Sequence, residues 1–117
     1  MHEALLQRLT SVAEQKSFLE CDGLTRVLSY ILSAEGIDHR TMMGCLQVQD
    51  REVLDFHCWI EVDHQILDFR ARMWLGVAQD IPHGLFDVSD YAVTYQGDEV
   101  DMSVSDSQFS LLISVGS

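Results

Sequence analysis

The spacing of apolar residues changes once along the chain, and this change limits the fold more than any other feature. Before Gly36, apolar residues recur every three or four positions, as in amphipathic helices. After Gly36, apolar and polar residues alternate, as in strands. The pattern predicts a helix over residues 3–18, a second helix from Cys21 to Gly36, and strands over residues 41–48, 56–62 and 65–70. We therefore expect an α+β fold, with N-terminal helices packed on an antiparallel sheet.

The length of 117 residues fits one domain, residues 1–117, because a chain of this size can bury a sufficient core. Residues 1–10 contain Glu3 and Arg8, whereas a signal peptide needs an uninterrupted apolar stretch. No segment approaches the roughly 20 apolar residues of a membrane span. The three cysteines are an odd number, so we expect a cytoplasmic protein with reduced thiols and no membrane partner.

The chain is strongly acidic, because 19 Asp and Glu residues against 7 Lys and Arg residues give a formal net charge of -12. Nucleic-acid binding needs clustered basic side chains, and here only Arg70 and Arg72 lie close together. We therefore expect no nucleic-acid partner. The acidic charge favours a cationic peptide, an amine or a basic protein as partner, and it also favours solubility. The oligomeric state is left open.

Three residues appear in the order that thiol chemistry needs. Cys21 begins the second helix, His57 lies in H-C-W-I-E-V, and Asp68 lies in I-L-D-F. A thiol is a strong nucleophile only as the thiolate, which a helix N-terminus or a nearby imidazolium favours. The imidazole in turn needs a third group to orient it. These residues are therefore the candidate nucleophile, base and orienting acid.

The strand pattern also predicts which side chains share a face. A two-residue turn at Asp63 and His64 makes His57 and Asp68 diagonal neighbours, a separation that an imidazole and a carboxylate can bridge. The predicted cross-strand pairs are Trp59 with Asp68 and His57 with Arg70. One face is then polar and carries His57, Trp59, Glu61, Asp68 and Arg70, and the apolar face carries Cys58, Ile60, Val62, Leu67 and Phe69.

The remaining segments give weaker signals. Residues 91–95 and 100–104 are predicted to form a hairpin around Gly97, and residues 50–52 a polar turn. Residues 109–115 form an apolar run whose type stays open. Cys45 and Cys58 fall on predicted strands, where we expect them to pack in the core. No cysteine or histidine pair has the spacing of a zinc site, so no metal is expected.

The segment from Cys21 to Asp68 resembles a known group of proteins. C-D-G-L-T-R-V-L-S-Y-I-L-S-A-E-G-I-D-H-R-T-M-M-G, followed by H-C-W-I-E-V and I-L-D-F, is similar to the core of the transglutaminase-like branch of the papain-like cysteine peptidase and acyltransferase superfamily. The leader-peptide peptidases of lasso-peptide biosynthesis share the pattern. The resemblance implies a papain-like, transglutaminase-like core with Cys21 as nucleophile, His57 as base and Asp68 as orienting acid. It also implies that Trp59 packs beside the site.

Two further residues are candidates for lining the site or stabilising an oxyanion. Gln15 precedes Cys21 by six positions, an interval that resembles the papain pattern. The backbone N–H groups at the start of the Cys21 helix are the alternative oxyanion donors. Arg70 is predicted either to bind a substrate carboxylate or to pair with an acid such as Glu61.

Two functions follow as expectations. The first is thiol-dependent acyl transfer on an amide or peptide bond, without a cofactor, by a cysteine peptidase, a deamidase or a transglutaminase-like acyltransferase. The substrate would be a peptide, a protein or an amine. The alternative is a non-enzymatic acidic interaction or inhibitor protein that keeps the fold and binds a basic partner. Glu20 and Asp22 favour this alternative, because carboxylates beside Cys21 oppose thiolate formation.

Overall fold

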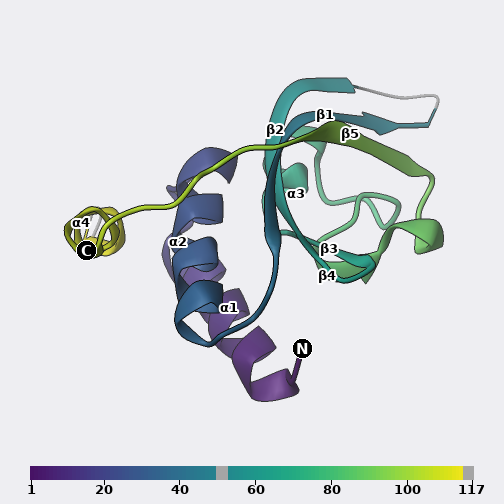
Figure 1. Ribbon diagram of the computed structural model, residues 1–117. Coiled ribbons are helices and arrows are strands. Elements are labelled where there is room, and N and C mark those ends of the chain that lie inside the picture. Colours follow the sequence, from purple (N-terminus) through teal and green to yellow (C-terminus); the bar gives the residue numbers. More distant parts are fainter. Residues whose placement is uncertain (50–52, 115–117) are drawn as a thin grey trace.

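The computed structural model describes residues 1–49 and 53–114 and shows an α+β architecture (Figure 1). A five-stranded antiparallel sheet has the order β4-β3-β2-β1-β5. Its strands are β1 (Arg40–Val48), β2 (Val53–Val62), β3 (Gln65–Asp68), β4 (Gly84–Asp87) and β5 (Val93–Glu99). The helices are α1 (Glu3–Gln15), α2 (Cys21–Ala34), α3 (Ala71–Leu75) and α4 (Asp106–Ser114), with a 3-10 turn η1 (Val88–Asp90). In these ranges no helix is long and apolar enough to cross a membrane.

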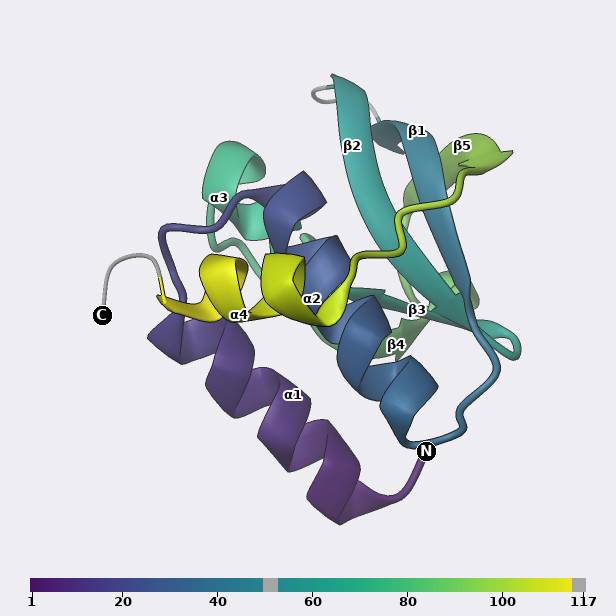
Figure 2. The same ribbon diagram turned by 60° about the vertical axis from the view of Figure 1, so that its left-hand side comes forward.

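The two N-terminal helices form where the sequence predicts them and cover one face of the sheet (Figures 1 and 2). Their apolar stripes form one core with the strand residues Ile60, Val62 and Leu67. Fully burying one such side chain stabilises a fold by roughly 1.5–3 kcal/mol. Helix α2 ends at Ala34 and has Glu35 as its C-cap; the next residue, Gly36, adopts φ 71, a left-handed conformation that glycine adopts without strain and that stops the helix.

The predicted turn between β2 and β3 is present. Val62 pairs with Gln65 and Ile60 with Leu67, as a two-residue turn requires. The described pairs end there, and Asp68 is the last residue of β3. The predicted pairing of His57 with Arg70 is wrong, because Arg70 has left the strand and is the N-cap residue of α3.

A β-bulge lies directly before His57. Gly44 of β1 pairs with His57, but Leu46 pairs with Leu54, so β2 has one residue more than β1 between the two pairs. Such a bulge bends a strand and changes the direction of its side chains. Phe56 inside the bulge is exposed, whereas His57 directly after it is completely buried.

The sheet face that carries His57 is buried, contrary to the prediction that it is a polar face. The chain between β3 and β5 covers it, on the side away from α1 and α2 (Figure 1). Two apolar clusters fill this side, one of Met42, Trp59, Ile66 and Phe86 and one of Leu46, Val48, Ala71 and Ile81. Glu61 stays near the surface in an ion pair with Arg40. The sheet therefore has a core on each face, and the site residues lie between them.

The predicted hairpin around Gly97 is wrong. Gly97 lies inside β5, directly opposite Gly44 of β1. A Cβ on Gly97 would lie 2.3 Å from the carbonyl oxygen of Met43, so only glycine allows the two strands to approach this closely. Residues 100–105 form no strand and lead to α4, which accounts for the apolar run up to Ser114. The predicted turn at 50–52 and the end of the run at Val115 lie outside the described residues.

Candidate functional site

His57 and Asp68 form a buried hydrogen bond between β2 and the end of β3. The distance between Nε2 of His57 and Oδ2 of Asp68 is 2.7 Å, and the two residues are 0% and 3% exposed. A carboxylate accepts and cannot donate, so Nε2 carries the proton in this bond. The contact predicted from the hairpin register is therefore present, and Nδ1 is the ring atom left for other chemistry.

Asp68 is held by four donors. Its Oδ1 accepts the backbone N–H groups of Arg70 at 2.9 Å and Ala71 at 3.1 Å, which lie at the start of α3. Its Oδ2 accepts the Tyr95 hydroxyl at 2.7 Å in addition to His57. The first N–H groups of a helix lack partners within that helix. The Asp68 carboxylate supplies this missing acceptor, and the two N–H groups in turn hold the carboxylate in place. The orientation of His57 thus depends on β3, α3 and β5 together.

Cys21 is the first residue of α2 and is 7% exposed. It lies in a small apolar cluster with Cys58 of β2 and Met102 of the segment that follows β5. The Cys21 thiol and the His57 ring are close enough for each to shift the pKa of the other. The buried Nδ1 of His57 has no hydrogen-bond partner of normal geometry among the described residues. The thiol therefore lies near the ring without a hydrogen bond to Nδ1.

The surroundings of this pair favour a thiolate and an imidazolium. A hydrogen bond from Cys58 and interactions with His57 outweigh burial and lower the pKa of Cys21 from 9.0 to about 5. Burial opposes protonation of His57, but its hydrogen bond to Asp68 and the nearby Cys21 thiol raise its pKa from 6.5 to about 9. The interaction with Cys21 and burial raise the pKa of Cys58, so Cys58 keeps its proton. We assign the thiolate to Cys21, because it begins a helix.

The neighbouring carboxylates do not prevent this ionisation. Glu20 and Asp22 flank Cys21 in sequence, but both are exposed to solvent, which screens their charges. The groups that set the pKa of Cys21 are instead Cys58 and His57. Glu20 is the N-cap residue of α2 and makes no side-chain capping bond. The first N–H groups of the helix therefore remain available as hydrogen-bond donors.

Arg70 is buried and binds backbone carbonyls, so both predicted roles of this residue are wrong. Its guanidinium donates to the carbonyl oxygens of Leu19 at 2.5 Å, Ala13 at 2.9 Å and Lys16 at 3.0 Å. A fourth bond reaches the carbonyl of Phe69 at 3.2 Å. Three of these carbonyls lie at the end of α1 and in the turn that leads to Cys21. Arg70 thus joins the end of β3 to the segment that positions the thiol.

The other two sequence candidates lie in different surroundings. Gln15 is the last residue of α1 and its side chain is exposed, and the described contacts do not bring it to the buried site. Trp59 is 1% exposed and packs near His57, with ring centroids 6.2 Å apart. Its Nε1 has no hydrogen-bond partner among the described residues. Trp59 therefore lies beside the site as the resemblance implies, whereas the role proposed for Gln15 has no support.

Little open space adjoins the thiol. A cavity of about 10 Å³ lies between α2 and the sheet, with Cys21, Cys58, Asp68 and Arg70 among its lining residues. This volume holds about one water molecule. Across residues 1–49 and 53–114, no group of three His, Cys, Asp or Glu side chains could hold a metal ion.

Comparison with known proteins adds no relative. No protein-family model matches the chain, and no curated protein or solved structure matches it either.

Two residues of the site were not identified from sequence. Tyr95 bonds to Asp68 from β5, a strand that pairs with β1 and that the sequence pattern did not place near the site. Cys58 was predicted to pack in the core, and it does, but it also touches the candidate nucleophile. Its position next to His57 in the same strand was the one available signal.

Proposed function

We propose that this protein catalyses thiol-dependent acyl transfer on an amide or peptide bond. One observation carries the proposal: the Nε2 of His57 is bound to Asp68 at 2.7 Å, while its other side faces a thiol whose pKa is lowered to about 5. Between about pH 5 and pH 9 the pair then exists as thiolate and imidazolium. A nucleophile, a proton donor and a group that orients the donor are the three parts that such a reaction needs.

The steps follow from these positions. The Cys21 sulfur attacks the amide carbonyl carbon, and the charge that develops on oxygen is stabilised by N–H groups at the start of α2. His57 gives its Nδ1 proton to the leaving amine, which leaves an acyl thioester on Cys21 and a neutral imidazole. Water or a second amine then attacks the thioester and gives its proton back to Nδ1. Asp68 accepts the hydrogen bond from the Nε2 proton throughout, so that proton stays on His57. No step needs a cofactor.

The proposal extends to the fold and the acceptor. A cysteine at a helix start, a histidine on a strand and an aspartate on the next strand support a transglutaminase-like member of the papain-like superfamily. Hydrolysis makes the protein a peptidase or deamidase, and transfer to an amine makes it an acyltransferase. Free Cys21, Cys45 and Cys58 support a reducing, cytoplasmic location.

The substrate we propose is a peptide or protein segment with apolar and basic side chains. The segments that carry the three site residues also expose large apolar side chains. Phe18, just before Cys21, is 41% exposed, and Phe56, just before His57, is 57% exposed. Trp74 lies on α3, the helix that follows Asp68, and is 54% exposed. Aromatic residues of this kind are enriched where peptides bind. The net charge of -12 supports a basic component.

The test is labelling with a peptide-like chloromethyl ketone, followed by mass-spectrometric mapping of the modified cysteine. We expect Cys21 to be modified, and Cys21→Ala to abolish both labelling and the cleavage of a peptide library. Cys45→Ala is the matched control and should change neither, because Cys45 lies on β1 outside the Cys21 cluster. Labelling spread equally over the three cysteines, together with peptide cleavage that survives Cys21→Ala, would remove the proposal.

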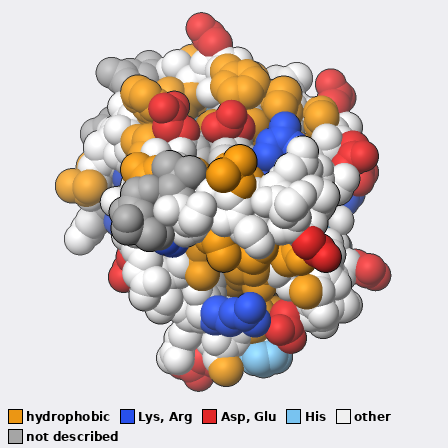
Figure 3. Space-filling model, turned by 90° about the vertical axis from the view of Figure 1, so that its left-hand side faces the viewer, with side chains coloured by type: hydrophobic (Ala, Val, Ile, Leu, Met, Phe, Trp, Pro, Cys, Tyr) orange, Lys and Arg blue, Asp and Glu red, His pale blue; other side chains and the backbone are white. Residues whose placement is uncertain are grey.

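A second candidate function is an acidic, non-enzymatic binding protein. The observation in its favour is the poor access of a substrate to the thiol. Cys21 is only 7% exposed, and the adjoining cavity has room for about one water. On the face seen in Figure 3, however, the acidic side chains are spread among others and do not gather in one patch. A fold that keeps its native spectrum and binds a basic protein, yet is never labelled at Cys21, would favour this candidate.

A further inference from the structure

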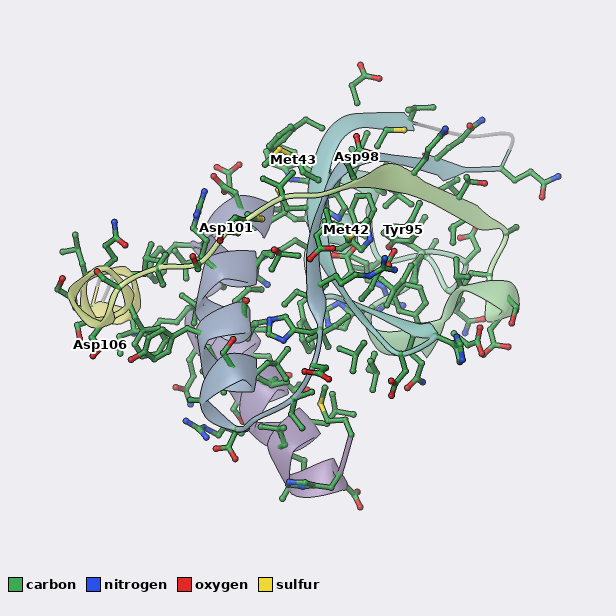
Figure 4. The ribbon with its side chains drawn as sticks, in the orientation of Figure 1. Met42, Met43, Tyr95, Asp98, Asp101 and Asp106 are labelled. Carbon is green, nitrogen blue, oxygen red and sulfur yellow. The ribbon has the colours of Figure 1, made fainter. Side chains whose placement is uncertain are left out.

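Tyr95 contacts the oxygen of Asp68 that also holds His57. Its hydroxyl lies 2.7 Å from Oδ2, and the bond joins β5 to the end of β3. Figure 4 shows Tyr95 on the side of the sheet away from α1 and α2. Its ring packs edge-on against Trp59, with centroids 5.1 Å apart, and lies 6.4 Å from the His57 ring. The hydroxyl is therefore fixed by packing as well as by its bond.

We propose that Tyr95 is a positioning residue of the Cys21 site, which acts on His57 by sharing Oδ2 of Asp68 with it. The inference rests on the proposed role of His57. The hydroxyl can only donate to a carboxylate oxygen. Tyr95 and His57 therefore both donate hydrogen bonds to the same negatively charged oxygen, Oδ2 of Asp68. Burial and the nearby Asp68 raise the pKa of Tyr95, so the hydroxyl keeps its proton across the working range of the site.

The consequence for His57 has a definite sign. While Tyr95 donates to Oδ2, less of the charge on that oxygen stabilises the imidazolium. Removal of the hydroxyl strengthens the interaction between Asp68 and His57, so the pKa of His57 should rise above about 9. Oδ1 keeps its two backbone donors at the start of α3, so Asp68 should remain in place.

Other charged groups near these residues stay the same in this comparison. Cys21 faces the His57 ring from α2, and Arg70 interacts with Asp68 from the start of α3. His83, which directly precedes β4, interacts electrostatically with Asp68, and Tyr91 interacts electrostatically with Tyr95. None of these side chains is altered by a change at Tyr95.

The experiment is a pH titration of the His57 ring nitrogens by NMR, in the wild type and in Tyr95→Phe. Phenylalanine keeps the ring that packs on Trp59 and removes only the hydroxyl. Hydrogen bonds to charged groups are strong enough that the expected rise in the His57 pKa is about one unit. Tyr91→Phe is the matched control, because Tyr91 packs on Phe86 in the same layer and should leave the titration unchanged.

A second variant covers the case in which Tyr95→Phe does not fold. Site-specific 3-fluorotyrosine at position 95 has a more acidic hydroxyl and is a stronger donor, so it should lower the pKa of His57. Opposite shifts from the two replacements support the inference. No shift in either, or equal shifts at Tyr91, overturns it. A wild-type His57 that titrates near 6.5, with Cys21 unreactive near pH 6, would instead overturn the proposed function.

Discussion

The ionisation of Cys21 gives the sharpest prediction, because it can be tested without a substrate. The thiol is expected to titrate near pH 5, against 9.0 for an ordinary thiol. At pH 6 about 90% of Cys21 should then be thiolate, compared with about 0.1% of an ordinary thiol. A thiolate of lower pKa is also less nucleophilic, by roughly 60-fold over this range. The two effects leave Cys21 about 15-fold more reactive than an ordinary, equally accessible thiol.

The assay is alkylation by iodoacetamide between pH 4 and pH 10, with the modified peptides quantified by mass spectrometry. Burial of Cys21 slows the reaction at every pH, so the absolute rate does not report the pKa of the thiol. The pKa is read instead from the midpoint of the pH profile. We expect a midpoint near pH 5 in the folded protein, and a higher midpoint in His57→Gln, where the partner charge is lost. In denaturant the midpoint should return to that of an ordinary thiol. A folded wild-type midpoint at pH 8 or above would refute the reasoning.

Three other substitutions, and Arg72→Met as a comparison for the last of them, test the surroundings of the site. Asp68→Asn should leave the circular dichroism spectrum unchanged but reduce turnover of any responsive amide substrate, by on the order of 10⁴ as in a comparable serine triad, because the amide favours the wrong tautomer of the imidazole. Cys58→Ala should raise the midpoint of Cys21 alkylation, because the bond from Cys58 is the largest influence on the Cys21 pKa. Arg70→Met should lower the free energy of unfolding in urea by at least about 3 kcal/mol, because several buried carbonyls lose their donor. Arg72→Met, which removes a single bond to a carbonyl, should cost about 1 kcal/mol.

The parts of the fold that depend on local sequence could be predicted. The helix α2, from Cys21 to Ala34, follows from an apolar stripe and from Gly36, a residue suited to positive φ just beyond the helix. The register between β2 and β3 follows from a two-residue turn, and Asp63 adopts φ 55 in that turn. The first feature predicts that Cys21 lies at a helix start, and the second predicts the contact of His57 with Asp68.

The parts that depend on distant residues could not be predicted. Gly97 looked like a turn residue, but it is needed because Gly44, far away in sequence, lies against it. The burial of the His57 face depends on how the chain between β3 and β5 folds back, which no period in β2 reveals. Arg70 binds carbonyls at the end of α1, so its role depends on a packing that the strand pattern does not contain. Tertiary neighbours decided each of these outcomes.

The place of β5 in the sheet has a consequence for how the protein is made. β5 leaves the ribosome after the other four strands of this sheet, yet it pairs with β1, about 50 residues earlier, and supplies the hydroxyl that donates to Asp68. Pairing over such a separation is slow compared with the closure of neighbouring hairpins. During synthesis, α2 and the β2–β3 hairpin can therefore form while the carboxylate still lacks one of its four donors. A chain released before Tyr95 would hold Cys21, His57 and Asp68 without the strand that completes their setting.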